Sequence, residues 1–138
     1  MQRLFTLVLL LTASSLTMAG PADDARTHFN AIANGDLATL GRSYHDNATL
    51  EWVGGPLDGT YTGREKIDEV WAKFGKANPE LKLTVEKVEE SANAKGGTVT
   101  ANVLFTGKNP IKVRFVLTFR DSRITSEIWQ IDPKLAIN

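Results

Sequence analysis

The stretch Asn47–Trp71, NATLEWVGGPLDGTYTGREKIDEVW, joins a strand to a helix through a glycine-rich loop. Apolar and polar residues alternate over Ala48–Val53, which predicts a strand with Trp52 on its buried face. Gly54-Gly55-Pro56 then predicts a loop. Thr62 and Glu65 have the spacing of a capping box, so a helix should follow. The apolar positions of this helix recur at helical spacing and form one buried stripe: Ile67, Val70, Trp71 and Phe74.

Two shorter helical patterns precede this stretch. Pro21, with two acidic residues close behind it, predicts a helix start, and Asn34-Gly35 predicts its end. Asp36 can cap a second helix that continues through Leu40 and Tyr44. Two helices should therefore precede the first strand.

After Pro79 the hydrophobic period changes from 3.6 to 2 residues, which predicts a series of strands. A phase slip at Lys87-Val88 indicates a β-bulge, and Asp121-Ser122 indicates a tight turn before a last strand from Ile124 to Asp132. The predicted order is α-α-β-α-β-β-β-β. This order is typical of an α+β fold, in which a curved antiparallel sheet wraps as a half-open cone around the N-terminal helices.

The composition excludes several functional classes. The chain has 138 residues, 16 basic and 16 acidic, and no basic cluster that would indicate a nucleic-acid partner. It contains no cysteine, which excludes disulfides, thiol chemistry and cysteine-ligated metal sites. No glycine-rich nucleotide-binding motif is present, so we expect no cofactor.

Residues 1–19 have the pattern of a secretory signal peptide. A short basic start precedes the apolar run Leu4–Leu16, and small residues favour cleavage near Ala19 or Ala22. The apolar run is shorter than the ~20 residues of a membrane-spanning helix, although an uncleaved anchor is the alternative. We therefore expect residues 20–138 to form one exported domain, periplasmic or secreted, without membrane association after cleavage.

Four segments, in this order, resemble a known superfamily: Ala31–Leu37 (AIANGDL), Tyr44–Glu51 (YHDNATLE), Thr62–Ile67 (TGREKI) and Glu127-Ile128-Trp129. They are similar to the superfamily of nuclear transport factor two, ketosteroid isomerase and the SnoaL-like polyketide cyclases, which has a cystatin-like fold. The resemblance covers the whole mature chain. It implies a conical pocket between the sheet and the helices, and a homodimer formed through the outer sheet face.

Aromatic and aliphatic residues on the inward faces of the strands predict the wall of this pocket. Ligand sites are typically apolar concavities with a few polar groups. We expect the side chains that surround a small, largely apolar molecule to be those of His28, Trp52, Trp71, Phe105, Phe115, Leu117 and Trp129.

The resemblance also locates the three working positions of ketosteroid isomerase. Its base corresponds to Trp52, its aromatic donor to His28 and its protonated acid to Leu117. Because Trp52 and Leu117 are apolar and His28 differs in kind, the isomerase mechanism, which needs a carboxylate base, is disfavoured.

His28 remains the candidate catalytic residue, because an imidazole can act as an acid or a base near neutral pH. A histidine with a purely structural hydrogen bond is the alternative. In cyclase-like relatives an acid near the tryptophan of the last strand often transfers the proton. Glu127 and Asp132 flank Trp129 on opposite faces of that strand, and alternation alone does not decide which one faces the pocket. The two histidines lack the spacing of metal ligands, so no metal site is expected.

Three functional hypotheses follow from these observations. The first is an exported protein that binds a small apolar molecule in the pocket without catalysis. The second is an isomerase, cyclase or hydrolase-like enzyme that uses His28. The third is a dimeric interaction module whose working surface is the outer sheet face, with Lys112, Arg114, Val116 and Arg120.

Overall fold

The computed structural model describes residues 20–138. The predicted signal peptide, residues 1–19, lies outside the described residues. The elements are Pro21–Asn34 (α1), Leu37–Ser43 (α2), Tyr44–Val53 (β1), Gly59–Thr62 (β2), Arg64–Ala77 (α3), Lys82–Asn93 (β3), Gly96–Thr106 (β4), Pro110–Arg120 (β5) and Arg123–Ile131 (β6).

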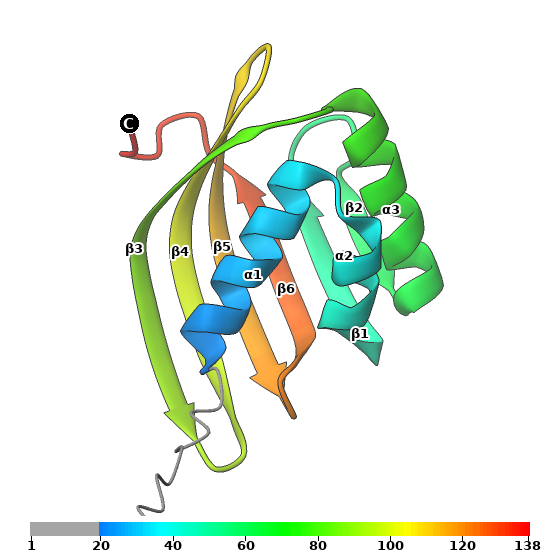
Figure 1. Ribbon diagram of the computed structural model, residues 1–138, viewed down its shortest axis with the longest axis vertical. Coiled ribbons are helices and arrows are strands. Elements are labelled where there is room, and N and C mark those ends of the chain that lie inside the picture. The colour runs from blue at the N-terminus through cyan, green and yellow to red at the C-terminus, as the bar shows by residue number, and fades with distance from the viewer. Residues whose placement is uncertain (1–19) are drawn as a thin grey trace, which may run out of the picture.

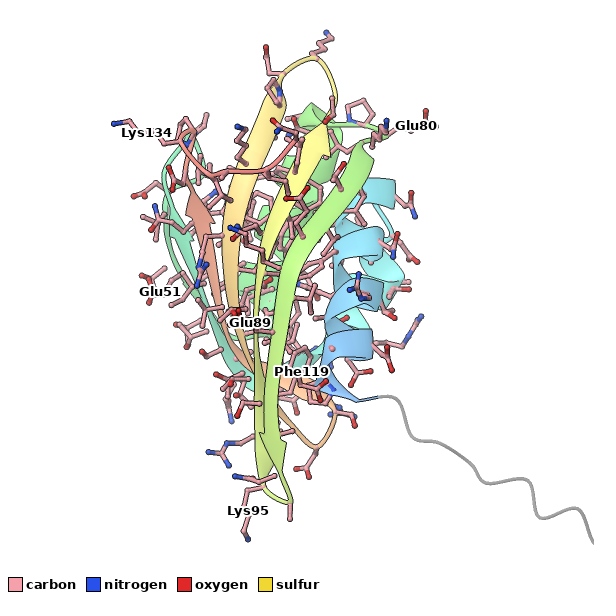
Figure 2. The ribbon with its side chains drawn as sticks, turned by 90° about the vertical axis from the view of Figure 1, so that its left-hand side faces the viewer. Glu51, Glu80, Glu89, Lys95, Phe119 and Lys134 are labelled. Carbon is pink, nitrogen blue, oxygen red and sulfur yellow. The ribbon has the colours of Figure 1, made fainter. Side chains whose placement is uncertain are left out.

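The strands form one curved sheet in the order β2-β1-β6-β5-β4-β3. Strands β1 and β6 pair in parallel, and the other pairs are antiparallel. The helices lie together on one face of the sheet (Figure 1), and within residues 20–138 the other face carries no helix (Figure 2). The α+β architecture predicted from the sequence is therefore confirmed.

Most of the predicted boundaries are also confirmed. Helix α1 ends at Gly35, whose φ of 65° is the left-handed conformation that glycine adopts easily. Asp36 caps α2 by accepting a hydrogen bond from the Thr39 backbone N–H at 3.1 Å. The pairing of β3 with β4 shifts between Glu86 and Glu89, which is the predicted bulge.

Three local predictions are wrong. Gly59–Thr62, expected to be loop, forms β2 and pairs with β1, so that Thr62 lies opposite Thr49. Helix α3 begins at Arg64 after Gly63, and no side chain caps it. Thr62 is the last residue of a strand and does not act as the expected cap. Tyr44, expected in the second helix, is the first residue of β1.

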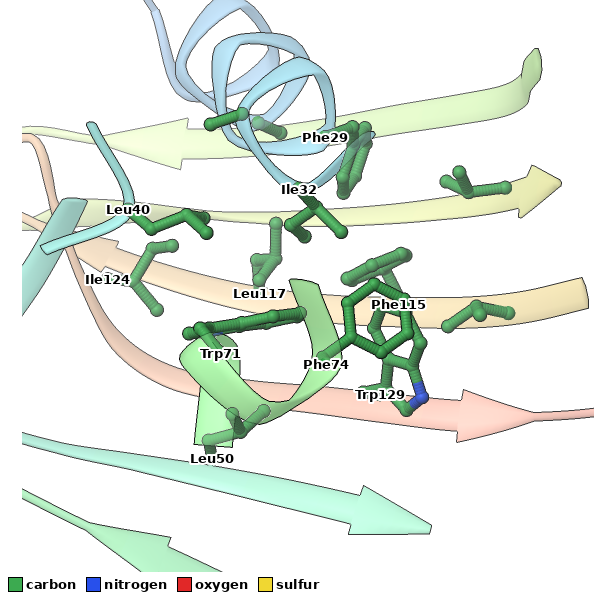
Figure 3. Close-up of a cluster of buried hydrophobic side chains, with 14 of the residues drawn as sticks. Phe29, Ile32, Leu40, Leu50, Trp71, Phe74, Phe115, Leu117, Ile124 and Trp129 are labelled. Atoms are coloured by element: carbon green, nitrogen blue, oxygen red, sulfur yellow. The ribbon is translucent and has the colours of Figure 1, made fainter. Parts of the chain in front are cut away.

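The core fills the space between the helices and the concave face of the sheet. Phe29 of α1 packs on Phe115 of β5 with ring centroids 4.5 Å apart. Trp71 and Phe74 of α3 belong to the same core cluster (Figure 3). Within residues 20–138, no helix has the length and apolarity needed to cross a membrane.

Candidate functional site

A groove of about 900 Å³ opens at one end of the cone. Its walls come from the β1–β2 loop, the last turns of α3, the β4–β5 turn and the carboxyl end of β6. These four segments are far apart in the sequence, and the sheet order brings them to the same end of the molecule. The principal apolar side chains of the groove are Trp52, Leu57, Phe74, Ile111, Trp129 and Ile131.

Two stacked tryptophans form the floor of the groove. Trp52 and Trp129 are direct neighbours in the parallel pairing of β1 with β6, and their ring centroids lie 4.5 Å apart. Phe105 stacks on the other side of Trp129 at 5.4 Å. Trp129 is completely buried, and its Nε1 has no hydrogen-bond partner within the described residues. The floor is therefore largely apolar, and the Trp129 N–H is a buried donor without a partner in residues 20–138.

The polar groups that line the groove are mainly basic. Its lining includes four lysines, Lys73, Lys76, Lys108 and Lys112, and no aspartate or glutamate. The Lys112 ammonium donates to the Leu135 carbonyl at 3.1 Å. In residues 20–138 none of these lysines forms an ion pair.

Deeper in the cone lies a buried polar cluster of His28, Tyr44, Trp71 and Glu127. Glu127 Oε1, on β6, accepts a hydrogen bond from the Tyr44 hydroxyl. The other carboxylate oxygen, Oε2, lies 2.7 Å from His28 Nε2. Trp71 Nε1 donates to the Tyr44 hydroxyl at 2.8 Å. The four side chains come from α1, β1, α3 and β6, so this chain of hydrogen bonds ties two helices to two strands of the sheet.

Burial has a direct electrostatic consequence for Tyr44. Removal from water, together with the charge of Glu127 and the hydrogen bond to it, raises the pKa of the Tyr44 hydroxyl well above the ordinary tyrosine value. Tyr44 therefore stays protonated and donates to the carboxylate at neutral pH.

None of the four side chains of the polar cluster lines the groove. His28 and Glu127 are each 1% exposed, and neither lines the groove. Trp71 separates them from the floor, because its ring centroid lies 6.2 Å from that of His28 and 5.2 Å from that of Trp52. A second hollow, of about 490 Å³ between α2 and α3, reaches Trp71 but none of the other three cluster members. The chemistry-bearing residues are thus sealed behind an aromatic layer.

Comparison with known proteins assigns the family. The family model described as "SnoaL-like domain" matches residues 25–127, which is more than half of the chain. The chain belongs to the SnoaL-like domain family. No curated protein sequence is significantly similar to it.

Solved structures share the fold of this SnoaL-like domain at low sequence identity. An NTF-2 like protein of unknown function from Burkholderia xenovorans aligns with a TM-score of 0.64 and 14% identity, over 84% of this chain and 85% of that one. A putative polyketide cyclase from Sinorhizobium meliloti aligns at 0.54 and 20%, over 78% and 94%. An LEH-like epoxide hydrolase from M. tuberculosis aligns at 0.59 and 17%, over 79% and 80%. Such different functions on one fold mean that the site residues, and not the fold, must carry the functional argument.

The structure divides the predicted site residues of the SnoaL-like domain into two groups. Trp52 and Trp129 border the groove. The others do not line it and are packed inside the core or the polar cluster: His28, Trp71, Phe105, Phe115 and Leu117. They lie deeper because the aromatic side chains fill the narrow part of the cone and leave space only at its mouth.

Sequence reasoning missed several residues of the SnoaL-like domain that matter here. The sequence pattern places Tyr44 in the second helix, whereas it begins β1 and lies beside His28. Glu127, and not Asp132, faces the interior and lies opposite Leu117 in the pairing of β5 with β6. The groove lysines lie on α3, on the β4–β5 turn and at the start of β5, and no sequence pattern joins these positions. The nearest usable signal was the parity of Glu127 with Trp129, two residues apart on one strand.

Proposed function

We propose that this SnoaL-like domain binds a small, largely apolar molecule in the groove above Trp52 and Trp129. The observation that carries the proposal is the groove itself, whose volume of about 900 Å³ lies within the range of small-molecule sites. Its floor of stacked indoles and its walls of leucine, isoleucine and phenylalanine favour an apolar occupant, because burial of apolar surface drives binding.

Binding is proposed in preference to catalysis because of where the acid–base groups lie. A catalytic group must come within hydrogen-bond reach of its substrate. His28, the sequence candidate, is directed at Glu127 and covered by Trp71. The His28–Glu127–Tyr44 cluster is therefore better explained as an internal brace between α1, β1 and β6.

Substitutions that fill the groove test the proposal. Ala77 lines the groove and is exposed on α3, so Ala77→Trp should fill the space without opening a cavity in the core. Ala72 is exposed on the same helix but lines the second hollow, which makes Ala72→Trp a matched control.

The binding of neutral apolar molecules such as naphthalene-2-ethanol is measured by calorimetry and by quenching of tryptophan fluorescence. We expect Ala77→Trp to weaken binding by about tenfold or more through the clash, and Ala72→Trp to leave binding unchanged. Absence of binding across a panel of such molecules, or equal loss in both variants, would contradict the groove as the site.

Export and dimerisation belong to the proposal as well. Amino-terminal sequencing of the mature protein tests cleavage near Ala19 or Ala22. Sedimentation at micromolar concentration tests the homodimer expected through the outer sheet face, which carries Arg114 and Val116. A purified protein that begins at Met1, or one that sediments as a monomer, contradicts the corresponding part.

A further inference from the structure

We propose that the molecule bound in the groove is an organic anion, with an apolar body against the stacked indoles and a carboxylate between the Trp129 N–H and the lysines of the rim. This inference rests on the proposed function and specifies the chemical class of the ligand. It draws on two independent observations, the sign of the charges around the groove and the unpaired indole donor at its floor.

The charge of the lining is unusual for this chain. The whole sequence carries 16 basic and 16 acidic residues, so an average surface would show both signs. The groove lining contains four lysines and no acidic residue. One of the four, Lys112, keeps its charge but is held by the Leu135 carbonyl, so the ammonium groups that are free to move towards a ligand are those of Lys73, Lys76 and Lys108.

The three rim lysines approach the groove from two sides. Lys73 and Lys76 are one helical turn apart near the end of α3, and Lys108 lies in the β4–β5 turn. A positive cleft with low-dielectric walls concentrates anions and raises their association rate. The carboxyl end of α3 opposes this effect, but the helix dipole supplies only about half a negative charge against two full positive charges from that helix.

The unpaired donor at the floor of the groove favours a ligand with a hydrogen-bond acceptor. Trp129 Nε1 is a buried donor with no partner in residues 20–138, and an indole nitrogen can only donate. Figure 3 shows this nitrogen on the side of the ring that faces away from Trp71, towards the carboxyl end of β6. A hydrocarbon or a cationic head group leaves this donor unpaired, whereas a carboxylate oxygen accepts from it and lies in a field of positive charge.

Three probes with the same naphthyl body separate the contributions of charge and shape. These are naphthalene-2-acetate, naphthalene-2-ethanol and 2-(naphthalen-2-yl)ethylammonium, each titrated by calorimetry at low and at high salt. We expect the acetate to bind about tenfold more tightly than the alcohol at low salt, and the ammonium probe to bind most weakly. The advantage of the acetate should shrink at high salt, because the rim charges are exposed and screened.

Two triple variants of equal net charge provide the control. Lys73→Gln, Lys76→Gln and Lys108→Gln together remove the rim charges, whereas Lys66→Gln, Lys87→Gln and Lys95→Gln remove three exposed lysines that do not line the groove. The first variant should lose the preference for the acetate and keep its affinity for the alcohol. The second should retain the preference.

The Trp129 donor has its own readout. In a ¹⁵N–¹H spectrum the three tryptophans give three indole N–H signals, which the single Trp→Phe variants assign. The acetate should move the Trp129 signal downfield, and the ammonium probe should not. A Trp129 signal that responds identically to both probes would remove the indole from the proposal.

The outcomes of these experiments distinguish the proposal of an anionic ligand from the proposal that the groove binds a small molecule. If the alcohol binds the wild-type groove as tightly as the acetate, or if the two triple variants behave alike, the anion inference is overturned while the apolar groove stands. If none of the probes and none of the panel of apolar molecules bind, both fail.

Discussion

Two tryptophans of the core, with ring centroids 5.5 Å apart, are in opposite chemical situations. Trp71 Nε1 donates to Tyr44 and so belongs to the hydrogen-bond chain of the polar cluster, which ends at His28. Trp129 Nε1, at the groove, is equally buried and has no partner within the described residues. Buried donors are normally paired, so an unpaired one needs an explanation. The inner cluster also keeps one buried atom without a partner in residues 20–138, His28 Nδ1, but that atom does not border the groove, whereas Trp129 does.

The largest expected effect on stability comes from removing the Glu127 carboxylate from the polar cluster. Glu127→Ala removes the partner of both His28 and Tyr44, and breaking a buried pair in this way costs about 3–5 kcal/mol of the free energy of unfolding. Urea unfolding at neutral pH measures it. Because Glu127 does not line the groove, the folded fraction should bind groove ligands as the wild type does.

Glu127→Gln is the matched control for that variant. It keeps the volume and one acceptor for the Tyr44 hydroxyl, so it should cost about 1–2 kcal/mol. Equal stability of the wild type and both variants would show that the cluster does not brace the fold. Loss of groove binding in well-folded Glu127→Gln would show that the two ends of the cone are coupled.

A smaller effect is expected at Tyr44, with a distinctive pH dependence. Tyr44→Phe loses the hydrogen bonds to Glu127 and from Trp71, which should cost about 1–3 kcal/mol of unfolding free energy at neutral pH. The folded pKa of Tyr44 is raised, so above about pH 10 the unfolded chain loses a proton that the folded protein keeps. Stability is therefore fully present below that pH and falls above it, by up to about 1.4 kcal/mol per pH unit.

The pH dependence of stability at alkaline pH distinguishes the contribution of Tyr44 from that of the other titrating groups. Unfolding free energies of the wild type and Tyr44→Phe are compared from about pH 8 to pH 11, spanning the ordinary tyrosine pKa. The variant retains Tyr61 and every lysine, so the difference between the two curves reports on Tyr44 alone. The curves should converge as the pH rises. Parallel curves would mean that the hydroxyl titrates in the folded protein as it does in the unfolded chain.

The sequence predicted the fold because its signals are periodic. The change from a period of 3.6 to a period of 2 after Pro79 locates the helices before the long meander, and buried Trp52 confirms the inward face of the first strand. The β2 strand was missed because it has four residues and two glycines nearby, and its pairing with β1 is a tertiary contact.

The site was less predictable than the fold, for a geometric reason. Alternation correctly placed Glu127 and Trp129 on the same face. Whether Tyr44 reaches Glu127, however, depends on the residue at which α2 ends and β1 begins. Whether aromatic side chains line a cavity or fill it depends on how closely α3 approaches the sheet, and a single sequence does not encode that distance as a pattern. The lysines of the rim converge only through the topology of the sheet.

The smallest effect is also the sharpest test of the contrast between the two tryptophans. Trp71→Phe and Trp129→Phe remove the same atoms from rings that are 1% and 0% exposed. They differ in hydrogen bonding, because only Trp71 loses a hydrogen bond and leaves the Tyr44 hydroxyl without its donor. Trp71→Phe should therefore be the less stable variant by about 1 kcal/mol, which chemical denaturation of the ligand-free protein resolves.

Equal losses of stability in the two variants would contradict this expectation. If Trp129→Phe costs as much as Trp71→Phe in ligand-free protein, the Trp129 donor already has a partner in solution, such as an ordered water at the floor of the groove. A ligand carboxylate would then have to displace that partner, and its gain from the indole would shrink accordingly. If the order is as expected, added naphthalene-2-acetate should stabilise the wild type more than Trp129→Phe, since only the wild type offers the donor.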